Sequence, residues 1–363
     1  MESFVTPKSI PETNGRWDYR RNPKLRRDPN LPYYDPEWNA RCESLKQATM
    51  TQESEAFRTA SWYVMINRPP DNGPVHPSKI EVTDPVRMTR RIKQVARFLG
   101  AQQVGVTELN QHWVMSFGNM LNSEKRIDLS AHRYTIVVMH EMDYEMYRSA
   151  PSPDTAAATG EGYSKMTYIT NRLAAYIRGL GYLAESHMTG EVLSIPSAIE
   201  AGLGQQGRHG MLIHPHYGPR LRLDTVTTDL PLAPDAPADI GAQEFCERCL
   251  RCARHCPQQA ITHDDMTDIA PTKSNRSGIK RWIINAERCY IGRDINPYKS
   301  CGVCIRVCPW NKPNVWYHRL SVAALQRWRW ARPALITLLL WLEDVFGYGK
   351  KQNWRNPLAE QRR

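Results

Sequence analysis

The sequence has no hydrophobic run long enough to cross a bilayer. Its longest apolar run, from Pro333 to Leu342, is ten residues long, half of the roughly 20 that a membrane-spanning helix requires. A twin-arginine export signal is also absent, because a polar and charged stretch follows Arg20 and Arg21. We therefore expect a cytoplasmic protein. The 333–342 run then either forms a buried helix or rests on a membrane surface or a partner.

Acidic residues are too few to balance the basic ones. The chain has 37 Asp and Glu against 48 Lys and Arg, a net charge of +11, and a pI near 9.2. Such a charge attracts acidic proteins, anionic lipid or nucleic acid. No recognised DNA- or RNA-binding motif is present, although residues 327–330 interleave arginine and tryptophan. A nucleic-acid partner is therefore not expected. The 41% hydrophobic and 23% charged residues are ordinary for a water-soluble globular protein.

The chain of 363 residues exceeds what one hydrophobic core usually serves. We expect an extended arm and lead-in over residues 1–80, a core over 81–238, a cysteine-rich module over 239–318, and a C-terminal helix and tail over 319–363 that completes the core. The proline-rich stretch 230–238 links the core to the module.

Within the core, the hydrophobic periodicity alternates between helical and strand-like segments. Asp84 and Pro85 form a helix start, and Gly162 opens a second helix that ends near Gly181. This alternation is typical of an α/β core. The expected elements are helices over 86–99 and 162–181 and strands over 104–106, 134–139, 211–214 and 221–227.

Eight of the nine cysteines lie in one short segment, residues 246–308. They form two runs that each end in Cys-Pro, and the first has the spacing of bacterial ferredoxins. In such a run three thiolates hold one 4Fe–4S cluster and the fourth reaches the other cluster. The second run repeats the pattern with a widened first gap. One cluster is therefore assigned to Cys246, Cys249, Cys252 and Cys308. The other is assigned to Cys289, Cys301, Cys304 and Cys256.

Two other uses of cysteine fit this spacing less well. Disulfides need an oxidising compartment, which the missing export signal disfavours. Zinc sites favour pairs of Cys-x2-Cys without Cys-Pro endings. The ninth cysteine, Cys42, is most simply a partly buried free thiol. A ferredoxin-like module occupies only part of the chain, so the core must hold the group to which electrons are delivered.

Gly202, Gly204 and Gly207 match the dinucleotide-binding fingerprint in isolation. That fingerprint needs a strand before it and a helix after it, and here helical spacing precedes the glycines and a strand follows. We interpret them as close-approach turns and do not expect NAD binding. Electrons must then come from a separate donor such as a ferredoxin, a flavodoxin or a quinol-linked protein. The basic surface suits an acidic donor.

Three segments carry a resemblance to a known family. The stretch from Ala201 to Leu223, followed by Thr227 to Pro231 and the double cysteine run, resembles the catalytic subunit of the reductive dehalogenases. Residues 342–349 look like that family's C-terminal signature. The match covers roughly residues 80 to 350. The epoxyqueuosine reductases share the corrinoid fold and the paired clusters, but the Tyr-Gly-Pro-Arg stretch at 217–220 is more similar to the dehalogenases.

The resemblance implies an α+β fold, with a nitroreductase-like α/β corrinoid-binding core and a ferredoxin-like module that holds two 4Fe–4S clusters. It implies a base-off cobamide between the two parts, an organohalide substrate and, as a further partner, a membrane anchor. A tyrosine of the family donates the proton, assisted by an arginine and by an Asn or Lys. These positions fall on Tyr163, on Arg222 with Arg220 as the runner-up, and at or near Thr189, which is a departure because Thr has neither amide nor ammonium.

The residue chemistry supports the tyrosine and arginine independently. A phenol has a pKa near 10, so it is a poor acid until a cation stabilises the phenolate, and a guanidinium stays charged throughout. Purely structural roles remain open for both residues. Tyr163 could pack in the core, and Arg222 could form an ion pair with Asp224 or Asp229. Two other functions also remain open. One is an epoxyqueuosine-type reductase acting on a tRNA nucleoside, and the other is an electron-transfer protein without corrinoid.

Overall fold

The computed structural model describes residues 57, 58, 60–62, 64, 73–116, 126–187, 190–272, 275, 277–295, 300–346 and 349–350. Most of the expected arm over residues 1–80 lies outside this part of the chain, as do Cys42 and Thr189.

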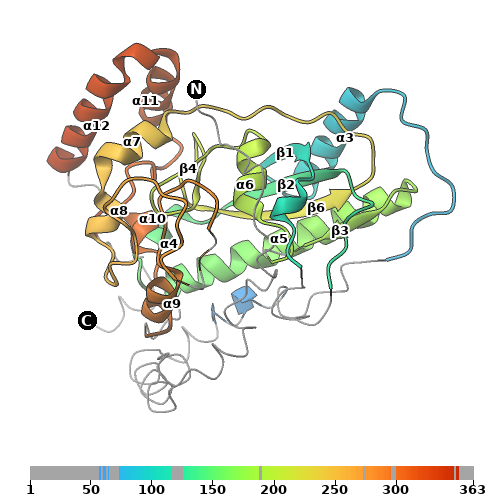
Figure 1. Ribbon diagram of the computed structural model, residues 1–363, viewed down its shortest axis with the longest axis horizontal. Coiled ribbons are helices and arrows are strands. Elements are labelled where there is room, and N and C mark those ends of the chain that lie inside the picture. Colours follow the sequence, from blue (N-terminus) through green and yellow to red (C-terminus); the bar gives the residue numbers. More distant parts are fainter. Residues whose placement is uncertain are drawn as a thin grey trace, which may run out of the picture.

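A four-stranded sheet forms the centre of the core (Figure 1). Its strand order is β1-β2-β6-β3, and each neighbouring pair is antiparallel. The strands are β1 (Gln103–Glu108), β2 (Tyr134–Glu141), β3 (Ala184–Ser186) and β6 (Leu221–Thr228). The strands predicted over 104–106, 134–139 and 221–227 are confirmed, and so is the α+β class. The alternating pattern had suggested α/β, whose strands run parallel; here they are antiparallel.

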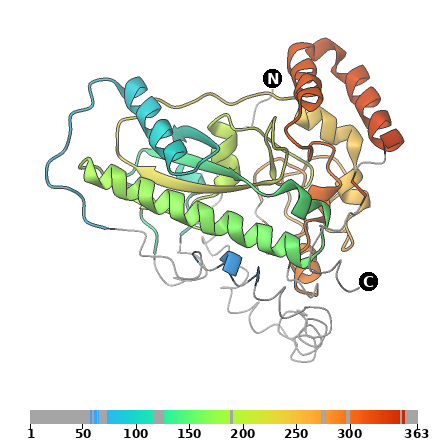
Figure 2. The same ribbon diagram turned by 180° about the vertical axis from the view of Figure 1, so that it is seen from behind.

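Two helices cover one face of the sheet, as Figure 2 shows. The longer is α5 (Pro153–Gly179) and the other is α3 (Pro85–Phe98). The side chain of Asp84 accepts a hydrogen bond from the backbone N–H of Arg87 at the start of α3. The predicted helix over 86–99 is confirmed. The buried side chains between these helices and the sheet include Ile92, Ile136, Val138, Met166, Ile169, Leu173 and Val226. Burying each of the larger ones contributes about 1.5–3 kcal/mol.

The prediction that Gly162 opens a helix is wrong. Helix α5 begins at Pro153, because the Ser152 side chain accepts the backbone N–H of Thr155 and proline fits the first turn. Gly162 lies in the helix interior, where an added Cβ would be 2.7 Å from Cγ of Arg222. The glycine therefore serves the packing of α5 on β6.

The opposite face of the sheet is covered by α6 (Ser194–Glu200). Behind it, β4 (Gln205–Gln206) and β5 (Leu212–Ile213) form a separate two-stranded sheet. The strand predicted at 211–214 thus exists but is not part of the main sheet. Gly204 has φ +156°, and a Cβ there would lie 2.1 Å from the carbonyl oxygen of Ile213. The interpretation of this glycine as a close-approach turn is confirmed.

Short helices hold the cysteine-rich module against one end of the core (Figure 1). Two of them carry the first three cysteines of the first run, α7 (Ala242–Cys249) and α8 (Arg251–Arg254). The second run is held by α9 (Ala286–Ile295) and α10 (Val303–Arg306). Helix α10 contacts α4 (Tyr144–Arg148) of the core. A further short helix of the core is η2 (Gln111–Trp113).

The C-terminal segment packs on the module, although it was expected to complete the core. It comprises α11 (Trp316–Arg327), η3 (Arg329–Ala331) and α12 (Arg332–Phe346). Helix α12 contacts α7, because its Ile336 shares an apolar cluster with Phe245 and Trp310 of the module. Several large apolar side chains of α12 remain exposed, among them Leu338, Trp341, Val345 and Phe346. Within the described ranges, no helix combines the length and apolar character needed to cross a membrane.

Candidate functional site

The eight cysteines of the module are free thiols that the fold gathers into two groups. In the first group, burial raises the pKa of the Cys308 thiol, and neighbouring thiols at Cys246, Cys249 and Cys252 raise it further. The same four residues line one small space between α7, α8 and the end of the second run. The fourth cysteine of the second run therefore lies with the first run.

The second group brings together the other four cysteines. Burial raises the pKa of the Cys304 thiol, and Cys289, Cys301 and Cys256 are among the neighbours that raise it further. The fourth cysteine of the first run, Cys256, therefore lies with the second run. This proximity agrees with the two sets of four that the ferredoxin spacing predicts, and the ligation of two clusters by these sets stays a prediction.

The chemistry of both groups fits iron–sulfur clusters. Burial and neighbouring thiols raise the pKa of several of these cysteines, among them Cys246, Cys252, Cys304 and Cys308. A bound cation that replaces the protons favours the thiolate, which is the form that binds metal. No three His, Cys, Asp or Glu side chains in the described part of the chain converge on a point that a single ion could occupy. A cubane needs no such point, because each thiolate ligates a different iron at its periphery.

The two groups occupy different positions relative to the core. Cys304 packs in an apolar cluster with Met142 and Tyr147 of the core. An added Cβ at Gly302 would lie 3.3 Å from the Tyr147 ring. Cys249 of the first group instead faces α12 and the module's outer surface. The second group is therefore the one that lies next to the core.

Tyr163 of α5 and Arg222 of β6 are in direct contact. The Cζ atom of Arg222 lies 4.3 Å from the centroid of the Tyr163 ring, within the range of a cation–π interaction. Both side chains are half-buried. The buried Nε of Arg222 has no hydrogen-bond partner among the described residues. The Trp62 ring is tilted against the Tyr163 ring, with 5.2 Å between the two ring centroids. The predicted proton donor and its cation thus lie together, with one N–H left for a ligand.

The two carboxylates that the sequence offered as ion-pair partners of Arg222 interact with other residues. Asp224 accepts a hydrogen bond from Thr170 at 2.9 Å, and Asp229 forms an ion pair with Lys79 at 3.1 Å. No ion pair links Arg222 to a carboxylate within the described ranges.

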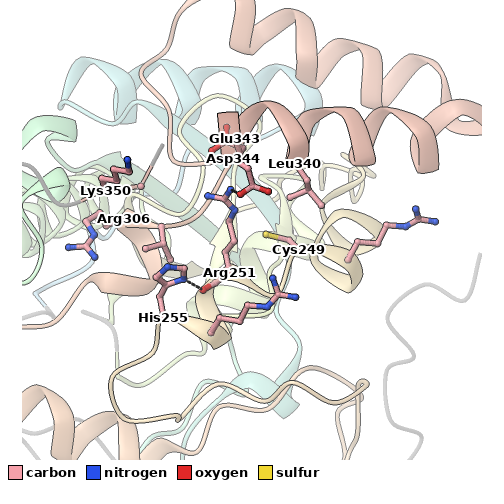
Figure 3. Close-up of a pocket in the computed structure, with 12 residues that line it drawn as sticks. Cys249, Arg251, His255, Arg306, Leu340, Glu343, Asp344 and Lys350 are labelled. Carbon is pink, nitrogen blue, oxygen red and sulfur yellow. Dashed lines mark hydrogen bonds and ion pairs between the residues drawn. The ribbon is translucent and has the colours of Figure 1, made fainter. Parts of the chain in front are cut away.

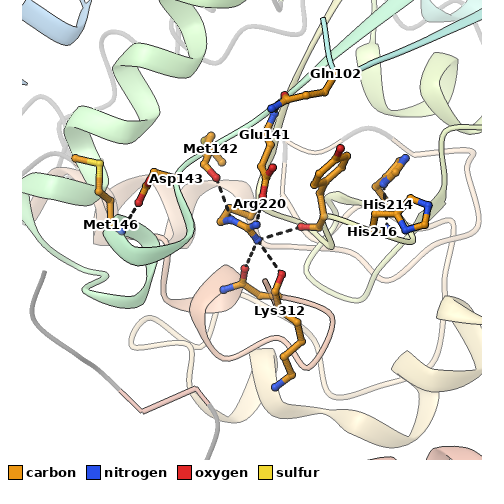
Figure 4. A network of polar contacts seen from close by, with 11 residues as sticks. Gln102, Glu141, Met142, Asp143, Met146, His214, His216, Arg220 and Lys312 are labelled. Carbon is orange, nitrogen blue, oxygen red and sulfur yellow. Dashed lines mark hydrogen bonds and ion pairs between the residues drawn. The ribbon is translucent and has the colours of Figure 1, made fainter. Parts of the chain in front are cut away.

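Arg220, the runner-up, is fully buried in a structural network (Figure 4). Its guanidinium pairs with Glu141 and donates to the Met142 carbonyl at 2.9 Å and to Asn311 at 2.9 Å. These bonds tie the end of β2 to the segment that follows the second cysteine run. The geometry therefore favours Arg222 over Arg220 as the residue available to a ligand.

Sequence reasoning missed two buried groups beside this pair. Burial raises the pKa of Tyr147, while the nearby Arg222 opposes that rise; its hydroxyl lies 2.7 Å from that of Thr159. His140 lies opposite Arg222 on β2, and burial lowers its pKa to about 4, so it is neutral at pH 7. Neither residue belongs to a motif, and only the sheet register and the packing of α4 place them here.

Comparison with known proteins identifies relatives of both parts of the chain. Residues 245–311 match the family model of the 4Fe–4S double cluster binding domain. The chain is 35% identical over 314 residues to the tetrachloroethene reductive dehalogenase of Sulfurospirillum multivorans, covering 79% of this chain and 60% of that protein. A solved catabolic reductive dehalogenase, in complex with 3-bromo-4-hydroxybenzoic acid, superposes with a TM-score of 0.65 at 26% identity, covering 82% of this chain and 41% of that one.

The chain is a homologue of the reductive dehalogenases. It spans about 60% of the length of this curated dehalogenase. A more distant relative is the epoxyqueuosine reductase of Aliivibrio fischeri, 26% identical over 299 residues, which cover 71% of this chain and 76% of that protein. In this dehalogenase homologue, the double-cluster match coincides with the module, and the Tyr163–Arg222 pair lies in the core beside it.

Proposed function

We propose that the protein is a corrinoid-dependent reductive dehalogenase that catalyses R–X + 2e⁻ + H⁺ → R–H + X⁻. The observation that carries the proposal is the contact between Tyr163 and Arg222 in a homologue of the dehalogenases, at the end of the core nearest the second cysteine group. Tyr163 donates the proton from its hydroxyl to the carbon that loses the halide. Arg222 stabilises the phenolate that remains, because its guanidinium stays charged.

The unpaired polar atoms at this site support a bound cobamide. Arg222 Nε and His140 Nδ1 are buried atoms without partners in the described part of the chain. Buried polar groups are normally satisfied, so these positions fit a ligand with polar edges such as the amide groups of a corrinoid. When bound, the reduced cobamide supplies electrons to the carbon–halogen bond. The polypeptide contributes the proton, orientation and shielding from water.

The two cysteine groups support an electron path toward this site. Each group would hold one 4Fe–4S cluster through its four thiolates. The second group is in contact with Tyr147, which lies within electrostatic reach of both Arg222 and Cys304. Two one-electron clusters can supply the two electrons of the reaction in succession. A separate one-electron donor would reduce the clusters.

Halide release tests this function. Protein reconstituted anaerobically with iron, sulfide and cobamide is given a low-potential reductant and either tetrachloroethene or 3-bromo-4-hydroxybenzoic acid, the halogenated compounds named for its relatives. We expect chloride or bromide release that requires both cobamide and reductant. Cobamide binding is checked separately by its visible absorption. Equal release without cobamide would contradict the proposal.

An epoxyqueuosine-type activity is the second candidate, because that relative is matched over 76% of its length and the net charge of +11 would favour a tRNA substrate. The same reconstituted protein is therefore assayed with an epoxyqueuosine-containing tRNA stem-loop. Reduction of the nucleoside with no halide release from either compound would favour this second function.

A further inference from the structure

A basic groove opens on the module surface next to the first cysteine group (Figure 3). It has a volume of about 440 Å³ and lies between α7, α8, α10 and the end of α12. Cys249 contributes to its wall. The basic residues that line it are Arg248, Arg251, Arg254, His255, Arg306 and Lys350.

The charge of the groove is not neutralised by its own acids. Two carboxylates line it, and each already has a partner: Asp344 pairs with Arg251, and Glu343 pairs with Lys312 at 2.6 Å. Arg248 and Arg254 are exposed and form no ion pair with a carboxylate in the described ranges. The groove therefore presents a net positive surface to solvent.

The position of the groove links it to the electron path. Cys249 lines the groove together with Arg251 and Arg254, so the first cysteine group lies next to the charged surface. The second group lies on the core side, beside Tyr147. An electron that enters at the groove would meet the first cluster and then the second before it reaches the Tyr163–Arg222 site.

We propose that the groove is the docking site of an acidic one-electron carrier protein. The proposal rests on the electron-transfer role of the clusters proposed above and assigns the surface at which electrons enter. In each encounter the carrier is oxidised by one electron and a cluster is reduced by one electron, with no bond formed or broken. Complementary charge mainly accelerates such association, and salt screens it over about 10 Å at 0.1 M.

Charge reversal tests the proposal in the holoprotein. The Arg248→Glu, Arg254→Glu double variant is compared with an Arg90→Glu, Arg97→Glu control, in which two exposed arginines of α3 undergo the same charge change at the other end of the molecule. Cluster reduction is followed by stopped-flow absorbance with an acidic flavodoxin in its reduced form as donor. At low ionic strength the clusters of the groove variant should be reduced at least about tenfold more slowly than those of the wild type. Added salt should make the two rates more similar.

A second reductant separates docking from damage to the cluster. Reduced methyl viologen is a small cation, so the acidic groove variant should react with it as fast as the wild type or faster. Equal slowing with both reductants, equal slowing in the α3 control, or no slowing with flavodoxin would overturn the proposal. So would loss of binding to anionic phospholipid vesicles with unchanged flavodoxin kinetics, because the groove would then face a membrane. No organohalide is present, so the result does not depend on the dehalogenase function.

Discussion

Two side-chain nitrogen atoms beside the first cysteine group have no hydrogen-bond partner in the described part of the chain. Trp310 and His209 line the same small space as its four cysteines. The indole Nε1 of Trp310 and Nε2 of His209 are buried and have no partner in the described part of the chain. The backbone N–H of Met211 donates to His209 Nδ1 at 3.2 Å, so the ring hydrogen of neutral His209 is on Nε2. Both groups can therefore donate N–H to cluster sulfur.

Removal of one such donor should shift the cluster's reduction potential. Hydrogen bonds to sulfur stabilise the more negative, reduced cluster and raise its potential. Trp310→Phe keeps the ring but removes the N–H, so we expect a more negative midpoint potential for one of the two clusters in an EPR-monitored redox titration. Trp330→Phe is the control, because that side chain is 86% exposed. An unchanged potential in the Trp310 variant would show that the indole does not bond to the cluster.

At the scale of the element, close packing of helix α5 on the sheet requires a glycine at one position of the helix and not at another. Gly162 and Gly179 belong to this one helix but have opposite surroundings. A Cβ at Gly162 would be 2.7 Å from Arg222, whereas a Cβ at Gly179 would meet nothing within 4 Å. The two glycines therefore separate the cost of packing from the cost of backbone entropy.

Alanine substitutions at these two positions should have opposite effects on stability. Gly179→Ala should stabilise the protein by about 0.5–1 kcal/mol, because alanine loses less entropy in a helix. Gly162→Ala should destabilise it by about 1–3 kcal/mol through overpacking and displace Arg222 from Tyr163. Urea denaturation followed by circular dichroism measures both. Equal stabilisation by the two variants would contradict this prediction, because it would mean that the Arg222 side chain can move away from the added methyl group without loss of stability.

The sequence predicted local elements better than their arrangement. The Asp84 cap, Pro85 and the spacing after them predict α3 because these interactions lie within one turn. Helix α5 was placed with the wrong start, because Gly162 looks like a break unless the side chain of Arg222 is known to lie against it. Strand periodicity is the same in parallel and antiparallel sheets, so the register that places His140 opposite Arg222 could not be predicted.

At the scale of the whole molecule, the cysteine spacing predicts the grouping of thiols because ligand distances within a cubane are fixed by chemistry. The predicted exchange of Cys256 and Cys308 between the runs would tie the two halves of the module together. The packing of α12 on α7 was not predictable from spacing, because its apolar residues could equally have covered the sheet.

This exchange predicts which cysteine variants behave alike. Cys308→Ala and Cys246→Ala should each impair the same cluster and leave the same EPR spectrum from the other. Cys304 is only four positions from Cys308, but Cys304→Ala should impair the other cluster. The EPR spectrum that remains should therefore be that of the cluster which Cys308→Ala impairs. Iron content should fall by about half in all three variants, since each keeps one complete set of four thiolates. A Cys308→Ala spectrum like that of Cys304→Ala would contradict the crossed arrangement.

The central claim is that halide is expelled at the Tyr163–Arg222 site, and single-turnover halide release tests it most directly. Tyr163→Phe is compared with Tyr168→Phe, a control on the same helix in which Arg172 also lies over the ring, at 4.7 Å, but in an exposed position. With equal cluster and cobamide contents, Tyr163→Phe should slow halide release by about 10²–10⁴-fold, as loss of a general acid does, and Tyr168→Phe should match the wild type. Undiminished release by Tyr163→Phe would contradict the account.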